Sequence, residues 1–101
     1  MENLVTIELK RRGYEFYYYL LKDRNEIDFV IRESRKITEV IQVTYDEDEI
    51  RSREMSNGIE TAKQLGAKKL TIVTWYRDEK EMRDDISIRF VPLWKWLVES
   101  V

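Results

Sequence analysis

Two polar side chains interrupt neighbouring apolar segments of the sequence, and together they have the chemistry of a metal site. Asp28 lies in the run EIDFVIR (26–32) and Gln42 in the run ITEVIQVTY (37–45). Because side chains alternate along a strand, a hairpin that turns around Arg35 places Asp28 directly opposite Gln42. Their Cβ atoms would then lie about 5 Å apart. A carboxylate and an amide oxygen at that spacing can share one hard cation such as Mg²⁺.

A third acidic residue, Glu8, lies in the segment ENLVTIELKRR (2–12), where apolar residues recur at helical spacing. Glu8 follows Leu4 by four positions, so it lies on or beside the apolar face of that helix. Packed over the sheet, Glu8 would supply a third oxygen to the metal. Two alternatives stay open: Glu8 is a boundary residue paired with an arginine, and Asp28 with Gln42 is a structural polar pair left from a lost site.

The sequence contains no histidine and no cysteine, which restricts the chemistry available to it. Serine–histidine hydrolysis, thiol nucleophiles, disulfides and zinc ribbons are excluded. Any catalysis would use carboxylates, lysine, tyrosine or a hard cation held by oxygen ligands.

Size and composition favour one compact domain over residues 1–101, with 43% hydrophobic and 38% charged residues and a net charge of -2. High and balanced charge with few glycines fits a heat-adapted protein. No apolar run approaches the roughly 20 residues of a membrane span, so we expect no membrane contact and a cytoplasmic location. The negative net charge does not favour nucleic-acid binding.

Periodicity predicts one α/β sandwich in the order αβββαβ, followed by a short strand and a helix. Three apolar segments with short connections favour an antiparallel meander, and a β-branched run favours a strand covered on both faces. The expected elements are a helix at 2–12, strands at 14–21, 26–32 and 37–45, a helix at about 48–65, a strand at 69–75, a charged loop at 76–85, a strand at 86–91, and a helix opened by Pro92.

These segments, in this order, resemble the PD-(D/E)XK or restriction-endonuclease-like superfamily. The resemblance rests on ENLVTIELKRRG followed by YEFYYY, on NEIDFVI, on ITEVIQVTYD, and on LTIVTW with a closing IRFVPLWKWL. More closely, the chain is similar to the C-terminal domain that follows AAA-type ATPase modules in many archaeal and bacterial ATPases of poorly defined function. The resemblance implies a restriction-endonuclease-like topology over nearly the whole chain.

The resemblance also implies a metal site that is incomplete. In such nucleases an acid on the second strand and an E-x-K motif on the third bind Mg²⁺, often with a helix Glu. Asp28 matches the strand acid and Glu8 the helix Glu, whereas the E-x-K position falls on Gln42-Val43-Thr44. Thr44 removes the lysine that would neutralise charge at the phosphate. Candidates for a migrated cation, or else solvated surface charges, are Arg51, Arg53 and Lys63.

Two functions therefore compete. One is a degenerate nuclease-like module that dimerises or docks onto an AAA-type ATPase, and the other is a Mg²⁺-dependent DNA endonuclease with Gln42 in place of the motif Glu. The missing lysine and the negative charge favour the first. Trp94 and Trp96 point to different sides of the last helix, so one side is available to a partner. The run Tyr17-Tyr18-Tyr19 could stack on bases, but a strand covered on both faces is the favoured interpretation.

Overall fold

The computed structural model of the chain describes residues 2–21, 26–43 and 53–99. These residues form helices and strands in the predicted order up to the fourth strand. The elements are α1 (Glu2–Arg11), β1 (Glu15–Leu21), β2 (Glu26–Glu33), β3 (Lys36–Val43), α2 (Arg53–Leu65), β4 (Lys69–Thr74), β5 (Glu79–Arg83), β6 (Ile86–Pro92) and α3 (Leu93–Val98).

The described strands form one mixed sheet in the order β1-β2-β3-β4-β6-β5. β1, β2 and β3 make the predicted antiparallel meander. β4 pairs in parallel with β3 on one side and with β6 on the other, and β5 lies at the edge, antiparallel to β6. The α/β fold expected from the sequence is therefore present.

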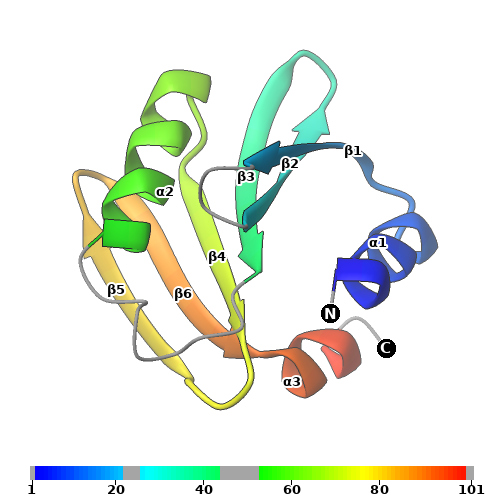
Figure 1. Cartoon of the computed structure of the whole chain (residues 1–101). Coiled ribbons are helices and arrows are strands. Elements are labelled where there is room, and N and C mark those ends of the chain that lie inside the picture. The colour runs from blue at the N-terminus through cyan, green and yellow to red at the C-terminus, as the bar shows by residue number, and fades with distance from the viewer. Residues whose placement is uncertain (1, 22–25, 44–52, 100–101) are drawn as a thin grey trace.

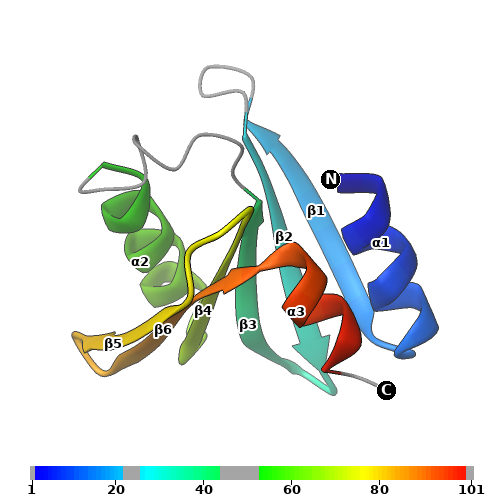
Figure 2. The same ribbon diagram turned by 90° about the horizontal axis from the view of Figure 1, so that it is seen from below.

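Helices cover both faces of this sheet. α2 lies against one face (Figure 1), and α1 and α3 lie next to each other on the other (Figure 2). Since successive side chains of a strand point to opposite faces, the central strands β3, β4 and β6 contribute to two buried clusters. The cluster beneath α2 includes Val40, Ile59, Ala62, Leu70, Ile72, Ile88 and Phe90. The cluster beneath α1 and α3 includes Val5, Leu9, Phe29, Ile31, Ile41, Val43, Val73, Val91 and Trp96.

β4 is buried on both of its faces, because Leu70 and Ile72 pack in the cluster under α2 whereas Val73 packs in the cluster under α1 and α3. All three side chains are at most 1% exposed. The β-branched run was expected to be covered on both faces, and this prediction is confirmed.

Glycines end the first two helices where the sequence predicted. Gly13 and Gly66 have φ angles of 78° and 76°, in the left-handed region that glycine adopts without strain. After α2, the Gly66 amide donates to the Lys63 carbonyl and the Ala67 amide to the Ala62 carbonyl. This pair of bonds is a Schellman motif, which satisfies carbonyls at the helix end.

Two expectations were wrong. The segment 76–85 was expected to be a loop, but it contains the edge strand β5, joined to β6 by Asp84 and Asp85 with φ angles of 52° and 66°. Tyr17 and Tyr18 were expected on a covered strand, but β1 is an edge strand and their side chains are 44% and 65% exposed. The part of the second helix expected before residue 53 lies outside the described residues.

Among the described residues, no helix has the length and apolar character needed to cross a bilayer.

Candidate functional site

The predicted pairing of Asp28 with Gln42 is present in the sheet. The two residues are direct partners across β2 and β3, as Val30 and Val40 are. The turn differs from the expected one, because Glu33 pairs with Lys36. A register shift after Ile31 adds the residue that brings the two strands back to the predicted alignment.

Gln42 is enclosed beneath α2. Its side chain is 2% exposed, and a Cβ atom added to Gly58 would lie 2.8 Å from Gln42 Oε1. Gln42 Nε2 is buried and has no hydrogen-bond partner among the described residues. For Asp28, the structure describes the backbone but not the side chain. The structure therefore places the amide of the candidate pair in the α2 core rather than on an open surface.

Glu8 lies on the other side of the sheet. It is 7% exposed on α1, between Val5 and Leu9 of the cluster that packs under α1 and α3. Its carboxylate accepts hydrogen bonds from Arg11 Nε at 2.9 Å and Nη2 at 2.6 Å, and from Arg12 Nε at 2.7 Å. The arginine-paired alternative therefore describes Glu8, and the structure does not bring Glu8 to Gln42.

These contacts test whether Glu8, Asp28 and Gln42 fit a shared Mg²⁺ ion. They do not fit as a set of three, because the sheet separates Glu8 from Gln42 and arginines occupy the Glu8 oxygens. Within the described part of the chain, no group of three or more acidic residues has the arrangement of a metal site.

Among the residues proposed to replace the missing lysine, the structure describes the side chain of Lys63 alone. Thr44, Arg51 and the Arg53 side chain lie outside the described residues. Lys63 is on the exposed side of α2, where its Nζ contacts Asp84 Oδ2 at 2.8 Å.

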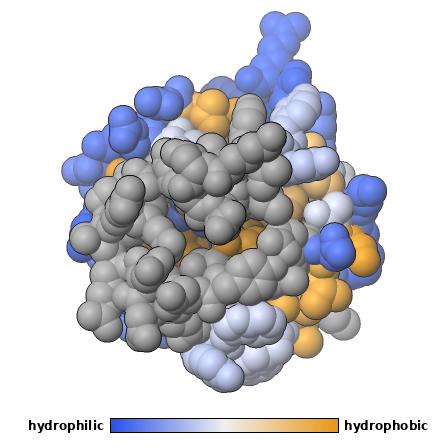
Figure 3. Space-filling model, in the orientation of Figure 1, coloured by the Kyte–Doolittle hydropathy of each residue, from blue (hydrophilic) through white to orange (hydrophobic). Residues whose placement is uncertain are grey.

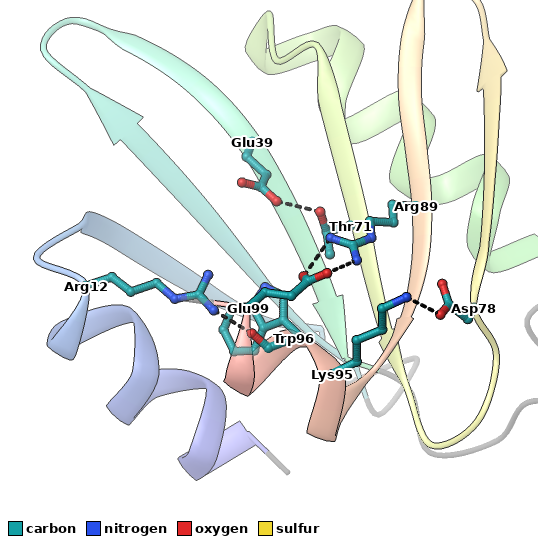
Figure 4. A network of polar contacts seen from close by, with 8 residues as sticks. All are labelled: Arg12, Glu39, Thr71, Asp78, Arg89, Lys95, Trp96 and Glu99. Atoms are coloured by element: carbon teal, nitrogen blue, oxygen red, sulfur yellow. Dashed lines mark hydrogen bonds and ion pairs between the residues drawn. The ribbon is translucent and has the colours of Figure 1, made fainter. Parts of the chain in front are cut away.

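A polar cavity that the sequence did not predict lies on the same face as α1 and α3. Its volume is about 320 Å³. Its floor consists of side chains from the strands, and Figure 4 shows Arg12 and Trp96 on one side and Glu99 reaching over it. The lining residues include Arg12, Glu39, Lys69, Thr71, Lys80, Ser87, Arg89 and Glu99.

An arginine–glutamate pair crosses this cavity. Arg89 of β6 binds Glu99 through both terminal nitrogens, with Nη1 at 2.8 Å from Oε1. The hydrogen bond from Arg89 lowers the pKa of Glu99, and the same bond raises the pKa of Arg89. Glu39, which lies on the opposite face of β3 from Gln42, accepts a short hydrogen bond from Thr71.

The outer sides of α1 and α3 carry apolar residues. Leu4 and Ile7 of α1 are 47% and 62% exposed, and Trp94 and Val98 of α3 are 65% and 57% exposed. Figure 3 shows apolar side chains at the surface on the right of the view, over α1. We call Leu4, Ile7, Trp94 and Val98 together the α1/α3 surface. Trp96 is 3% exposed, so the prediction that the two tryptophans point to different sides is confirmed.

The sequence resembles other proteins whose function is not established. Residues 1–96 match the family model described as "Domain of unknown function (DUF4143)". The "Uncharacterized protein MJ1544" of Methanocaldococcus jannaschii is 37% identical over 107 aligned positions, which cover 95% of this chain and 24% of the relative. The chain thus spans about a quarter of the curated relative that it matches.

Proposed function

Because the chain belongs to the DUF4143 family, whose members often lie at the C-terminus of AAA-type ATPases, we propose that it is an interaction domain that docks onto an ATPase module. Most of the matched relative lies outside the region that this chain covers. A domain that recurs as the smaller part of longer proteins has a larger neighbour available for contact.

The observation that carries this proposal is the α1/α3 surface. Exposed apolar side chains that gather on one side of a protein mark interaction sites more often than single ones do. Trp94 is a large aromatic residue, of the kind that contributes most to binding energy when a partner buries it. Its ring is held out on a short helix whose other tryptophan, Trp96, anchors that helix in the core.

We propose further that the fold is a degenerate form of the restriction-endonuclease-like topology. In support, a helix and a three-stranded meander precede α2, and β4 then joins β3 in parallel. Gln42 lies under α2 and Glu8 is bound by two arginines, so neither is presented to a substrate. These contacts favour a structural use of the former site residues.

Binding in trans tests the docking proposal. The part of the Methanocaldococcus jannaschii relative outside the matched region is produced as a separate polypeptide and titrated with this chain by calorimetry. We expect saturable binding that weakens at least about tenfold in Trp94→Ser, because a buried aromatic anchor contributes about 2 kcal/mol or more. Met82→Ser is the matched control, since Met82 is 68% exposed on β5, away from the α1/α3 surface.

Three results would contradict this proposal. They are the absence of binding, equal losses in the Trp94 and Met82 variants, and a homodimer in sedimentation velocity that Trp94→Ser dissociates. The last result would assign the α1/α3 surface to a second copy of this chain.

A Mg²⁺-dependent DNA endonuclease is the second candidate, and the direct pairing of Asp28 with Gln42 favours it. The test is cleavage of plasmid and branched DNA with Mg²⁺ or Mn²⁺. Cleavage that Asp28→Ala abolishes supports a nuclease. Cleavage that persists in that variant comes from another source, and no cleavage on either substrate removes this candidate.

A further inference from the structure

The cavity beside α3 collects positive charge in a chain whose net charge is -2. Four cationic side chains line it, and two carboxylates oppose them. The cations are Arg12, Lys69, Lys80 and Arg89, and the carboxylates are Glu39 and Glu99. A recess lined mainly by one sign of charge concentrates ligands of the opposite sign.

The strand register explains why these cations converge. Arg89 of β6 lies opposite Lys80 on β5 and opposite Thr71 on β4. Two residues earlier on the same face of β6, Ser87 lies opposite Lys69. Directly paired residues have Cβ atoms roughly 5 Å apart, so Arg89, Lys80, Ser87 and Lys69 form one compact group of donors.

Two of these cations are in direct contact with no carboxylate in the described part of the chain, although the charge of Lys80 contributes to the lowered pKa of Asp78. Lys69 and Lys80 form no ion pair with the residues that the structure describes, whereas Arg12 is held by Glu8 and by the Trp96 carbonyl, the latter at 2.6 Å. Arg89 has a further donor to offer, because its Nε is buried without a hydrogen-bond partner in the described part of the chain. A buried donor without a partner is unfavourable, and an anionic ligand would satisfy it.

Glu99 shows what kind of ligand Arg89 accepts. Its carboxylate receives hydrogen bonds from both terminal nitrogens of Arg89, the geometry in which arginine binds carboxylates and phosphates. Glu99 is the residue just after α3, and its side chain is 35% exposed, so it can turn out of the cavity into solvent. Glu99 therefore acts as an anion from the chain itself, bound to Arg89 at the position that an external anion would take.

We propose that this cavity binds the phosphate of a small phosphomonoester, with Arg89, Lys80 and Lys69 as the cations and Ser87 as a hydroxyl donor. A doubly charged phosphate matches the two lysines without ion pairs and displaces Glu99 from Arg89. The volume of about 320 Å³ lies at the lower end of the range for small-molecule sites, which leaves room for a small organic group beside the phosphate.

Calorimetry with phenyl phosphate and with inorganic phosphate, at constant ionic strength, tests this site. We expect both to bind at a single site, and Arg89→Gln to weaken binding at least about tenfold, the loss of a charge-assisted hydrogen bond. Lys80→Gln should also weaken binding, and since Lys80 is exposed it leaves the fold intact. Glu99→Gln should strengthen binding several-fold, because it removes the competing charge.

Arg83→Gln is the matched control, because Arg83 is a half-exposed cation on β5 outside the cavity. Equal losses of phosphate affinity in the Arg83 and Lys80 variants would overturn the proposal. It would also be overturned if neither the wild-type protein nor Glu99→Gln bound either phosphate. Weaker binding in Glu99→Gln would show that Glu99 is part of the site and not a competitor. Binding of single-stranded DNA but of neither phosphate would assign the cavity to nucleic acid. None of these results depends on the α1/α3 surface.

Discussion

Gly58 packs directly onto the Gln42 side chain. Replacing Gly58 by alanine has two opposing effects on the free energy of unfolding, a gain in helix propensity and a loss from overpacking. Alanine is favoured over glycine inside a helix by about 1 kcal/mol. The added Cβ would lie 2.8 Å from Gln42 Oε1 and 2.9 Å from Leu70 Cδ2, closer than such atoms normally approach. Gln42 and Leu70 are both at most 2% exposed, so neither has free space to move into.

We therefore expect overpacking to exceed the gain in helix propensity. Extra atoms in a packed core cost about 1–3 kcal/mol, which leaves Gly58→Ala destabilised by about 1 kcal/mol. For a domain of this size, that loss lowers Tm by about 4–8 °C. Urea denaturation followed by circular dichroism, with thermal melts, measures both quantities.

The double variant locates the cause. Gln42→Ala removes two of the three closest atoms, so Gly58→Ala in that background should be neutral or stabilising, with a coupling energy of about 1 kcal/mol. If Gly58→Ala alone stabilises the protein, or if the two substitutions are additive, then Gln42 does not pack against α2 as described. That result would also reopen the interpretation of Gln42 as an accessible metal ligand.

Three further predictions concern ion pairs and turns. Glu8→Ala should lower the free energy of unfolding by about 2 kcal/mol in urea titrations, since it leaves the largely buried Arg12 without this carboxylate. Glu99→Gln should lower Tm at neutral pH but not in acid. Arg89 holds the pKa of Glu99 below its ordinary 4.5. The Arg89–Glu99 pair therefore stabilises the fold above pH 4.5, and this stabilisation is lost as the pH falls through the folded-state pKa of Glu99. Asp85→Gly should raise stability by about 0.5 kcal/mol in thermal melts, because glycine adopts the positive φ of 66° without strain.

Matched variants make these predictions refutable. Glu15→Gln removes an exposed carboxylate at 3.9 Å from Arg32, so it should change the free energy of unfolding by less than about 0.5 kcal/mol. If Glu8→Ala had an equally small effect, the partly buried Glu8–Arg12 pair would not stabilise the fold as described. A Tm difference for Glu99→Gln that does not shrink as the pH is lowered below 4.5 would argue against the Arg89 contact as its cause. Asp85→Ala should destabilise, and a gain from alanine would show that the turn angle is not responsible.

The sequence predicts the meander because short connections join three apolar segments, and it predicts the register from a hairpin that turns around Arg35. The register is correct even though the turn is not the expected one, since the shift after Ile31 offsets the difference. Alignment was fixed by the need to bury Val30 and Val40 together, and the turn adapted to it.

Other features depend on packing that no local pattern encodes. The face that α1 covers is set by the path of the chain after Gly13, so the helical spacing around Glu8 could not show on which side of the sheet it would lie. β5 was missed because its residues, EKEMR, are mostly exposed and show no apolar alternation. The cavity was missed because each of its strands contributes only one or two polar residues, which are far apart in sequence.

The central position of β4 also determines the order in which the strands of the sheet unfold locally. Both edges of β4 are hydrogen-bonded to parallel partners, and neither partner is its neighbour in a hairpin. Its amides should therefore exchange with solvent deuterium only when the whole sheet separates. The β5–β6 hairpin closes through a two-residue turn, and β5 pairs with no second strand among the described residues, so β5 can fray while the rest of the sheet persists. Lys80, a proposed phosphate ligand, lies on that fraying strand, and bound phosphate should slow deuterium uptake there first.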